Sequence, residues 1–244
     1  MAWKYVYLFD IPLFIRNQGI FWEPGVLQIF LNILLFQSLF IYHKRKITLL
    51  SIFVLITTWS STGMVIMLLQ LVVFYATNIK KKRFLVFIPV SLLIAFGMIY
   101  ILQSNLQEKL EGDKASSSVQ RSIDTLSTLY LIKEYPWFGI GLDSNNYTNL
   151  LSKHTIFITG RLGALRESAG ISNSLLYYFV FFGIPIGLFF LYALYRQFLI
   201  RTKQWLFFLI VTTSSLTEPV LLLTFFSLFM ISGLINMIKP RVRI

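Results

Sequence analysis

The stretch ITLLSIFVLITTWSSTGMVIMLLQLVVFYAT, residues 47–77, decides how this chain folds. It is mostly apolar, and basic clusters at residues 44–46 and 80–83 bound it on both sides. Because one membrane-crossing helix takes about 20 apolar residues, this run is too long for a single ordinary helix. Basic clusters are retained on the cytoplasmic side, so both ends lie there and the run crosses an even number of times. The polar break at residues 60–63 suits a turn, and we predict two short helices, 47–59 and 62–78.

Composition extends this pattern to the whole chain. Of its 244 residues, 56% are hydrophobic and 13% are charged, whereas a soluble domain has about 25% charged residues. This excludes a soluble enzyme and a disordered chain. Residues 205–238 repeat the broken pattern around polar residues 214–219, and three other runs fit one crossing each. We expect an all-α polytopic transmembrane bundle, a single integral-membrane domain over 1–244, with about seven spans: 24–42, 47–59, 62–78, 84–102, 174–195, 205–214 and 219–238.

The basic residues fix the expected orientation. Four clusters hold 13 of the 22 lysines and arginines with no acidic residue among them. This is typical of cytoplasmic loops rather than of a nucleic-acid-binding face. Residues 103–173 carry seven acidic and seven basic residues and are predicted to form one large extracytoplasmic loop. The N-terminus is then outside and the C-terminus cytoplasmic, and a chain that starts outside is typical of one that lacks earlier spans.

Inside this loop, residues 116–134 are predicted to form an interfacial helix. Serines can cap its start, and Pro136 prevents its continuation. Helical spacing predicts an apolar face opposite a polar face, and that polar face is either solvated or presents Arg121 to a lipid phosphate. The apolar set is Val119, Ile123, Leu126 and Tyr130, and the polar set is Arg121, Asp124, Thr125 and Thr128.

A second polar cluster precedes the span at residue 174. It is either an ordinary water-exposed loop or part of a catalytic site, because only this loop has enough polar groups for one. Trp137 suits the lipid headgroup region. Two other features are expected to be structural, namely Glu-Pro pairs at 23–24 and 218–219 that head helices, and Gln28 and Asn32, which should bond a neighbouring helix. The cluster comprises His154, Arg161, Arg166, Glu167 and Asn173.

Several chemistries are disfavoured by what the sequence lacks. There is no cysteine and there are two histidines, which disfavours thiolate and histidine-based metal sites. The sequence contains no Gly-rich phosphate loop and no HExxH, GxSxG or DxD-type motif. We therefore expect no metal and no cofactor, and a lipid-linked substrate rather than a nucleotide.

The order of motifs along the chain is informative. RNQGIFWEP (16–24) precedes a span, TWSSTG (58–63) breaks a helix pair, and EYPWFGIGL (134–142) follows Arg121 in the loop. The loop ends with SNSLL (172–176), and FGIPIGL (182–188) follows. From Arg16 to the last helix, the chain resembles the bacterial O-antigen polymerase (Wzy-type) and O-antigen ligase superfamily, GT-C-like polytopic membrane glycosyltransferases. It departs at Ser61, where the family often has arginine, and at Ser172, where ligases have histidine.

The resemblance implies metal-independent glycosyl transfer at the outer face of the bacterial cytoplasmic (inner) membrane. Undecaprenyl-diphosphate-linked glycans would be both donor and acceptor, and a chain-length regulator a further partner. The absence of the ligase histidine favours a polymerase. The alternatives are an O-antigen ligase that transfers glycan to an acceptor lipid, and a membrane transporter or flippase without glycosyltransferase activity.

The resemblance also assigns roles to residues. Arg121 matches the family's loop arginine and Arg16 the arginine ahead of a span. Arginine binds phosphate oxygens in a bidentate fork, which suits the leaving diphosphate. Two residues without a family match, His154 and Glu167, are candidate general bases. Further candidates for substrate binding are Arg161, Arg166, Asn173 and Trp137.

Overall fold

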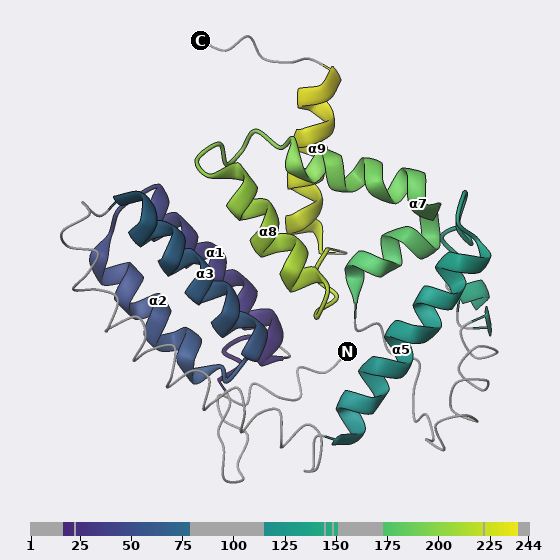
Figure 1. Ribbon diagram of the computed structural model, residues 1–244, viewed down its shortest axis with the longest axis horizontal. Helices are drawn as coiled ribbons and strands as arrows, with labels where there is room; N and C mark the ends of the chain where they lie inside the picture. Colours follow the sequence, from purple (N-terminus) through teal and green to yellow (C-terminus); the bar gives the residue numbers. More distant parts are fainter. Residues whose placement is uncertain are drawn as a thin grey trace. The chain divides into compact units, whose positions relative to one another are not determined.

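A computed structural model describes residues 17–21, 23–78, 115–143, 145–147, 149–150, 173–221 and 223–238. These residues form helices and turns, with no strand among them, which confirms the all-helical expectation for this part of the chain. The helices, labelled in Figure 1, are α1 (Pro24–Phe40), α2 (Arg45–Thr57), α3 (Ser61–Asn78), α5 (Ala115–Glu134), α7 (Ser174–Tyr195), α8 (Gln204–Ser215) and α9 (Thr224–Ile238).

The chain divides into two compact units. Unit 1 contains α1, α2 and α3 together with residues 209–214 of α8. Unit 2 contains α5, α7 and α9 together with residues 204–208 and 215 of α8.

Two described helices, α3 and α7, are long and apolar enough to cross a membrane, and α1, α8 and α9 are shorter apolar helices. The expected span at 84–102 lies outside the described residues. The number of seven spans and their orientation therefore stay predictions.

The run 47–77 forms two helices, as predicted, with the break at residues 58–60. The Thr58 hydroxyl donates to the Leu55 carbonyl at 2.7 Å and so bonds the last turn of α2. Trp59 then adopts a positive φ of 50°. The Ser60 hydroxyl accepts from the Gly63 amide at 3.3 Å, which caps the start of α3. The second broken run likewise forms α8 and α9, but the connection between them extends from 216 to 223.

In unit 1, α1 and α2 are antiparallel. Thr48 Oγ1 donates to Ser38 Oγ at 3.0 Å where α1 ends and α2 begins. At the opposite end, Asn17 Nδ2 donates to Thr57 Oγ1 at 3.1 Å, which ties the segment before α1 to the last turn of α2. This is the alternation that successive membrane crossings require.

A buried cluster of three carboxamides joins α1 to α3. Asn32 Nδ2 lies 3.0 Å from Gln28 Oε1 and 3.2 Å from the Gly63 carbonyl, and Asn32 Oδ1 accepts from Gln70 Nε2 at 2.9 Å. Gln28, Asn32 and Gln70 are all fully buried. The expectation of a bond to a neighbouring helix is confirmed for Asn32, whereas Gln28 bonds Asn32 within its own helix. Such hydrogen bonds help hold helices together where lipid removes the hydrophobic driving force.

Replacing Asn32 by leucine is expected to destabilise unit 1 by about 1–2 kcal/mol, because partners on two helices lose their shared hydrogen-bonding group. The measurement is the thermal unfolding of the detergent-solubilised protein by circular dichroism. Gln37→Leu, at a half-buried position of the same helix outside the cluster, is the control and should unfold near the wild-type temperature. Equal effects of the two changes would show that the cluster contributes nothing specific.

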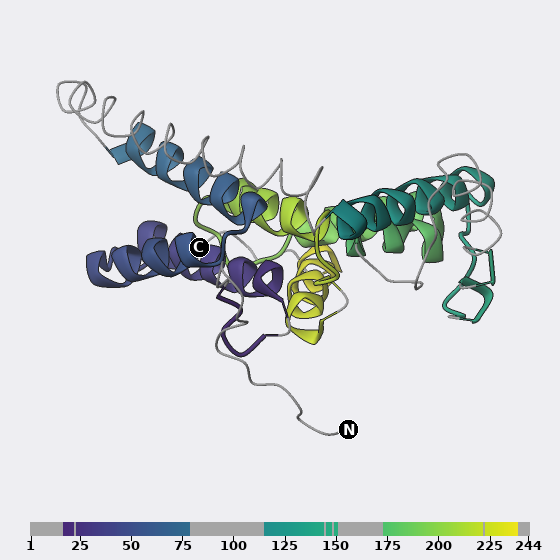
Figure 2. The same ribbon diagram turned by 90° about the horizontal axis from the view of Figure 1, so that it is seen from below.

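In unit 2, α5 lies along α7, as Figure 2 shows. A core of Leu131, Tyr147, Tyr177 and Val180 forms at this contact. The predicted helix at 116–134 is confirmed with nearly the predicted ends.

The predicted faces of α5 are partly wrong. Leu126 and Tyr130 of the predicted apolar face are exposed, which agrees with an interfacial helix whose apolar face meets lipid. Asp124 and Thr128, expected on the solvated side, are buried. The buried stripe instead follows i, i+4 spacing through small hydroxyl residues as well as apolar ones, so tertiary packing overrides the hydropathy pattern. The stripe comprises Ile123, Asp124, Ser127, Thr128 and Leu131.

The predicted continuous helix over 174–195 is bent. Gly183 has a φ of 77° and a ψ of 170°, which is non-helical, so two helical arms meet there. Figure 1 shows the arms of α7 meeting at a sharp angle. The bend has a tertiary cause, which lies in the turn that follows α5.

Candidate functional site

The turn at residues 136–141 is bonded to the bend of α7 through main-chain atoms. The Ile140 amide donates to the Val180 carbonyl at 2.9 Å, and the Gly141 amide donates to the Phe181 carbonyl at 3.1 Å. In a continuous helix a carbonyl accepts from the amide four residues later. We call this contact the glycine interlock.

The interlock also bonds an amide that the bend releases. The Ile184 amide, which would bond Val180 in a straight helix, donates to the Pro136 carbonyl at 2.7 Å. Pro185 has no amide hydrogen, so Phe181 could not have found its helical partner in any case. The two motifs quoted from the sequence, PWFGIG and FGIPIG, therefore form one hydrogen-bonded structure.

Glycine is needed on both sides of the interlock. Gly139 has a φ of 65°, and a Cβ there would lie 2.4 Å from the Val180 carbonyl oxygen. Gly183 has a φ of 77°, and a Cβ there would lie 2.3 Å from the Trp137 carbonyl oxygen. Neither the backbone conformation nor the space admits a side chain.

Trp137, a predicted substrate-binding residue, lies on the outside of this contact. Its side chain is 71% exposed and that of Phe138 is 85% exposed. Their main chains are held against α7 while both rings face outward. Exposed aromatic rings at such a position suit a membrane–water interface.

At the start of α7, Asn173 has a structural role. Its Oδ1 accepts from the Leu176 amide at 3.1 Å and caps the helix. Asn173 is 7% exposed. Contact between Asn173 and a substrate stays a prediction.

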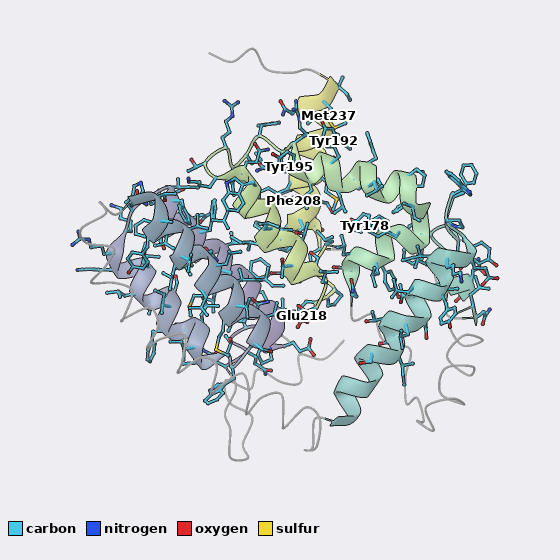
Figure 3. The ribbon with its side chains drawn as sticks, in the orientation of Figure 1. Tyr178, Tyr192, Tyr195, Phe208, Glu218 and Met237 are labelled. Carbon is cyan, nitrogen blue, oxygen red and sulfur yellow. The ribbon has the colours of Figure 1, made fainter. Side chains whose placement is uncertain are left out.

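The next residue, Ser174, fastens α7 to the α8–α9 connection. Its hydroxyl donates to the Glu218 carbonyl at 2.8 Å and accepts from the Leu221 amide at 3.1 Å. Tyr178, one turn further along α7, donates its hydroxyl to the Leu221 carbonyl at 3.2 Å. Figure 3 shows Tyr178 on the first arm of α7 and Glu218 at the connection. We call these bonds the Ser174 clamp.

Ser174→Ala is expected to destabilise unit 2 by about 1–3 kcal/mol, because it leaves the buried Leu221 amide without its acceptor. Ser227→Ala on α9 is the matched control, since that hydroxyl only reaches the Leu223 carbonyl of its own helix region at 3.5 Å. The comparison is made by thermal unfolding in detergent. A Ser174→Ala protein as stable as Ser227→Ala would show that the clamp is dispensable.

Arg121 is part of α5, whose last turn leads into the interlock. Of the other predicted site residues, Arg16, His154, Arg161, Arg166 and Glu167 lie outside the described residues, and their roles stay predictions.

A groove of about 320 Å³ lies in the angle of the bent α7. Aromatic residues from both arms of α7 line it, together with residues of α9 and Leu142 of the turn. The lining is almost wholly apolar, so the groove suits a hydrocarbon chain better than a sugar. The aromatic residues are Tyr178, Phe181, Phe182 and Phe190.

Two features of this region escaped the sequence analysis. The expected helix-heading role of the Glu218–Pro219 pair is wrong, because α9 begins only at Thr224. Glu218 is nevertheless buried, with an exposed fraction of only 5%. Ser174, the second serine of the motif SNSLL, is the sequence feature from which the clamp could have been predicted.

Among the residues that the structure describes, no group of three or more histidines and acids could hold a metal ion.

Two of the described helices are long and apolar enough to cross a membrane. Residues 47–192, more than half of the chain, match the family model described as O-antigen ligase. The chain belongs to the O-antigen ligase family, whose members are ligases and polymerases of surface glycan assembly. The match includes the α2–α3 break, α5, the interlock and most of α7. No curated protein and no solved structure matches the chain.

Proposed function

We propose that this protein polymerises undecaprenyl-diphosphate-linked repeat units into surface polysaccharide at the outer face of the cytoplasmic membrane. The family match supports an O-antigen polymerase or ligase type of function. The observation that favours polymerisation is Ser172, which stands where ligases resembling this chain carry histidine. A chain-length regulator is the proposed protein partner.

In this reaction, a hydroxyl of one lipid-linked glycan attacks the anomeric carbon of another. The bond from that carbon to the diphosphate breaks, and the bonding electrons leave with the lipid diphosphate. Negative charge grows on the leaving group, so fixed positive charge beside it lowers the barrier. Arg121 and Arg16 are the proposed carriers of that charge, with Arg161 and Arg166 in support.

The geometry of unit 2 supports a lipid-linked substrate. The interlock presents Trp137 and Phe138 outward, and aromatic rings favour the headgroup level of a bilayer. The groove lined by Leu142 and the arms of α7 is apolar and suits an isoprenoid chain. A donor anchored there would place its diphosphate near the polar loop.

The test is deletion of the gene, followed by gel analysis of surface polysaccharide. Single-repeat glycan in place of a ladder is the expected result. Loss of all glycan attached to the acceptor lipid would instead assign ligase activity. An unchanged ladder would overturn both readings and favour a transporter or flippase.

A further inference from the structure

Glu218 is a buried acidic residue in the connection between α8 and α9. It lies six positions before the start of α9, beyond the reach of a helix cap. The residue is only 5% exposed. Acidic side chains are almost never fully buried unless something requires them there, because burying a charge is costly.

The Ser174 clamp fixes where Glu218 lies. The Glu218 carbonyl accepts the Ser174 hydroxyl at 2.8 Å, and the Leu221 amide bonds the same hydroxyl at 3.1 Å. Glu218 is thereby held at the first residue of α7, beside the capping residue Asn173. The positive end of a helix dipole stabilises an anion placed near it. The main chain of Glu218 is thus held at the N-terminal end of α7.

The other carboxylates that the structure describes are less suited to chemistry. Glu134 and Asp143 are exposed, and Asp143 Oδ1 accepts from the Asn145 amide within its own turn. Glu23 belongs to unit 1, where it precedes Pro24 at the start of α1. Asp124 is buried, but it lies in the middle of a regular helix on the stripe that packs α5. Glu218 alone of these five combines burial with a position at the end of the helices.

We propose that Glu218 is the general base of the glycosyl transfer, an inference that rests on the proposed function. Its carboxylate takes the proton of the acceptor hydroxyl as that oxygen bonds to the anomeric carbon. The bond from the anomeric carbon to the donor diphosphate breaks, and its electron pair leaves with the diphosphate. The products are the new glycosidic bond, the free lipid diphosphate and a protonated Glu218, which returns its proton to water. Proton transfer to a positioned side chain contributes about 10²–10⁴-fold to a rate.

The experiment uses the full chain in membranes of the deletion strain, with lipid-linked repeat units extracted from that strain as substrate. Glu218→Gln keeps the size of the side chain but cannot take a proton. We expect its turnover to fall about 10²–10⁴-fold, at unchanged membrane level and with little change in KM. Glu218→Asp should retain more activity than Glu218→Gln. Asp143→Asn, which keeps the acceptor oxygen of its turn, is the control and should polymerise normally.

Chemical rescue separates catalysis from structure. Sodium formate should restore part of the turnover of Glu218→Ala, whereas sodium chloride at equal ionic strength should not, because only formate supplies a carboxylate. Loss of the Glu218→Gln protein from the membrane, or no rescue by formate, would assign Glu218 a structural role and overturn the proposal. If the wild-type chain is active and the Glu218→Gln variant turns over at the normal rate, this inference alone is overturned. No polymer from the wild-type chain would overturn the proposed function and the inference with it.

Discussion

Gly183→Ala is expected to separate the turn from α7 and to remove most folded protein from the membrane. The new Cβ would lie 2.3 Å from the Trp137 carbonyl oxygen and 2.8 Å from the Phe138 amide nitrogen, both main-chain atoms that cannot rotate away. The left-handed backbone adds about 1–2 kcal/mol of strain. Loss of the three interlock hydrogen bonds adds about 0.5–1.5 kcal/mol each. The sum, on the order of 3 kcal/mol or more, is a large part of a typical folding free energy.

Gly141→Ala is the matched control within the same motif. Gly141 has a similar φ of 78°, but nothing lies within 4 Å of the position of its Cβ. Only the backbone strain of about 1–2 kcal/mol remains. Membrane levels and unfolding temperatures in detergent are measured for both proteins, with Gly139→Ala expected to resemble Gly183→Ala. Equal losses for Gly183→Ala and Gly141→Ala would show that backbone conformation alone matters and that the interlock does not.

Arg121→Ala is expected to slow polymerisation by about 10²–10³-fold, by analogy with loss of a single oxyanion donor. The reason is that the donor diphosphate would lose one cationic clamp as its charge develops. Arg121→Lys should recover only part of the rate, because an ammonium keeps the charge but not the planar fork. The measurement is complementation of the deletion strain, scored by the polysaccharide ladder at matched membrane levels.

Arg201→Ala is the control for charge alone. Arg201 is exposed in the connection between α7 and α8, a segment predicted to be cytoplasmic. The polysaccharide ladder of the strain that carries Arg201→Ala should be near normal. A full-length ladder from Arg121→Ala would mean that Arg121 only anchors the loop helix at the interface. The phosphate site would then be sought at Arg16 or Arg161.

The helices could be predicted from the sequence because their signals are local. Apolar runs of the right length, Pro24 at the first turn of α1, and the polar residues at 58–63 and 214–219 lie within or beside the helices that they delimit. The end of α5 follows in the same way from Pro136, whereas its start at Ala115 lies one residue before the serines that were expected to cap it. The bond between Asn32 and α3 was also foreseeable, since an amide in an apolar helix requires a partner.

The site depends on contacts that no local pattern contains. Hydropathy over residues 174–195 is continuous, so the sequence predicted a straight helix. The bend exists because Ile140 and Gly141, some 40 positions earlier, bond the carbonyls of Val180 and Phe181. Pro185 and Gly183 permit this arrangement, and the docked turn supplies hydrogen-bond partners for the Val180 and Phe181 carbonyls and the Ile184 amide.

The surroundings of Glu218 and the faces of α5 have the same origin. A Glu-Pro pair predicts a helix start from local propensity, yet Ser174, 44 positions away, holds Glu218 in a connection instead. On α5, tertiary packing buries the stripe that contains Ser127 and leaves the more apolar Leu126 exposed. By itself the sequence determined which segments are helices and which family their motifs resemble. Only the tertiary structure decided which polar groups are buried together, because burial depends on the partner element and not on the residue's own neighbours in the chain.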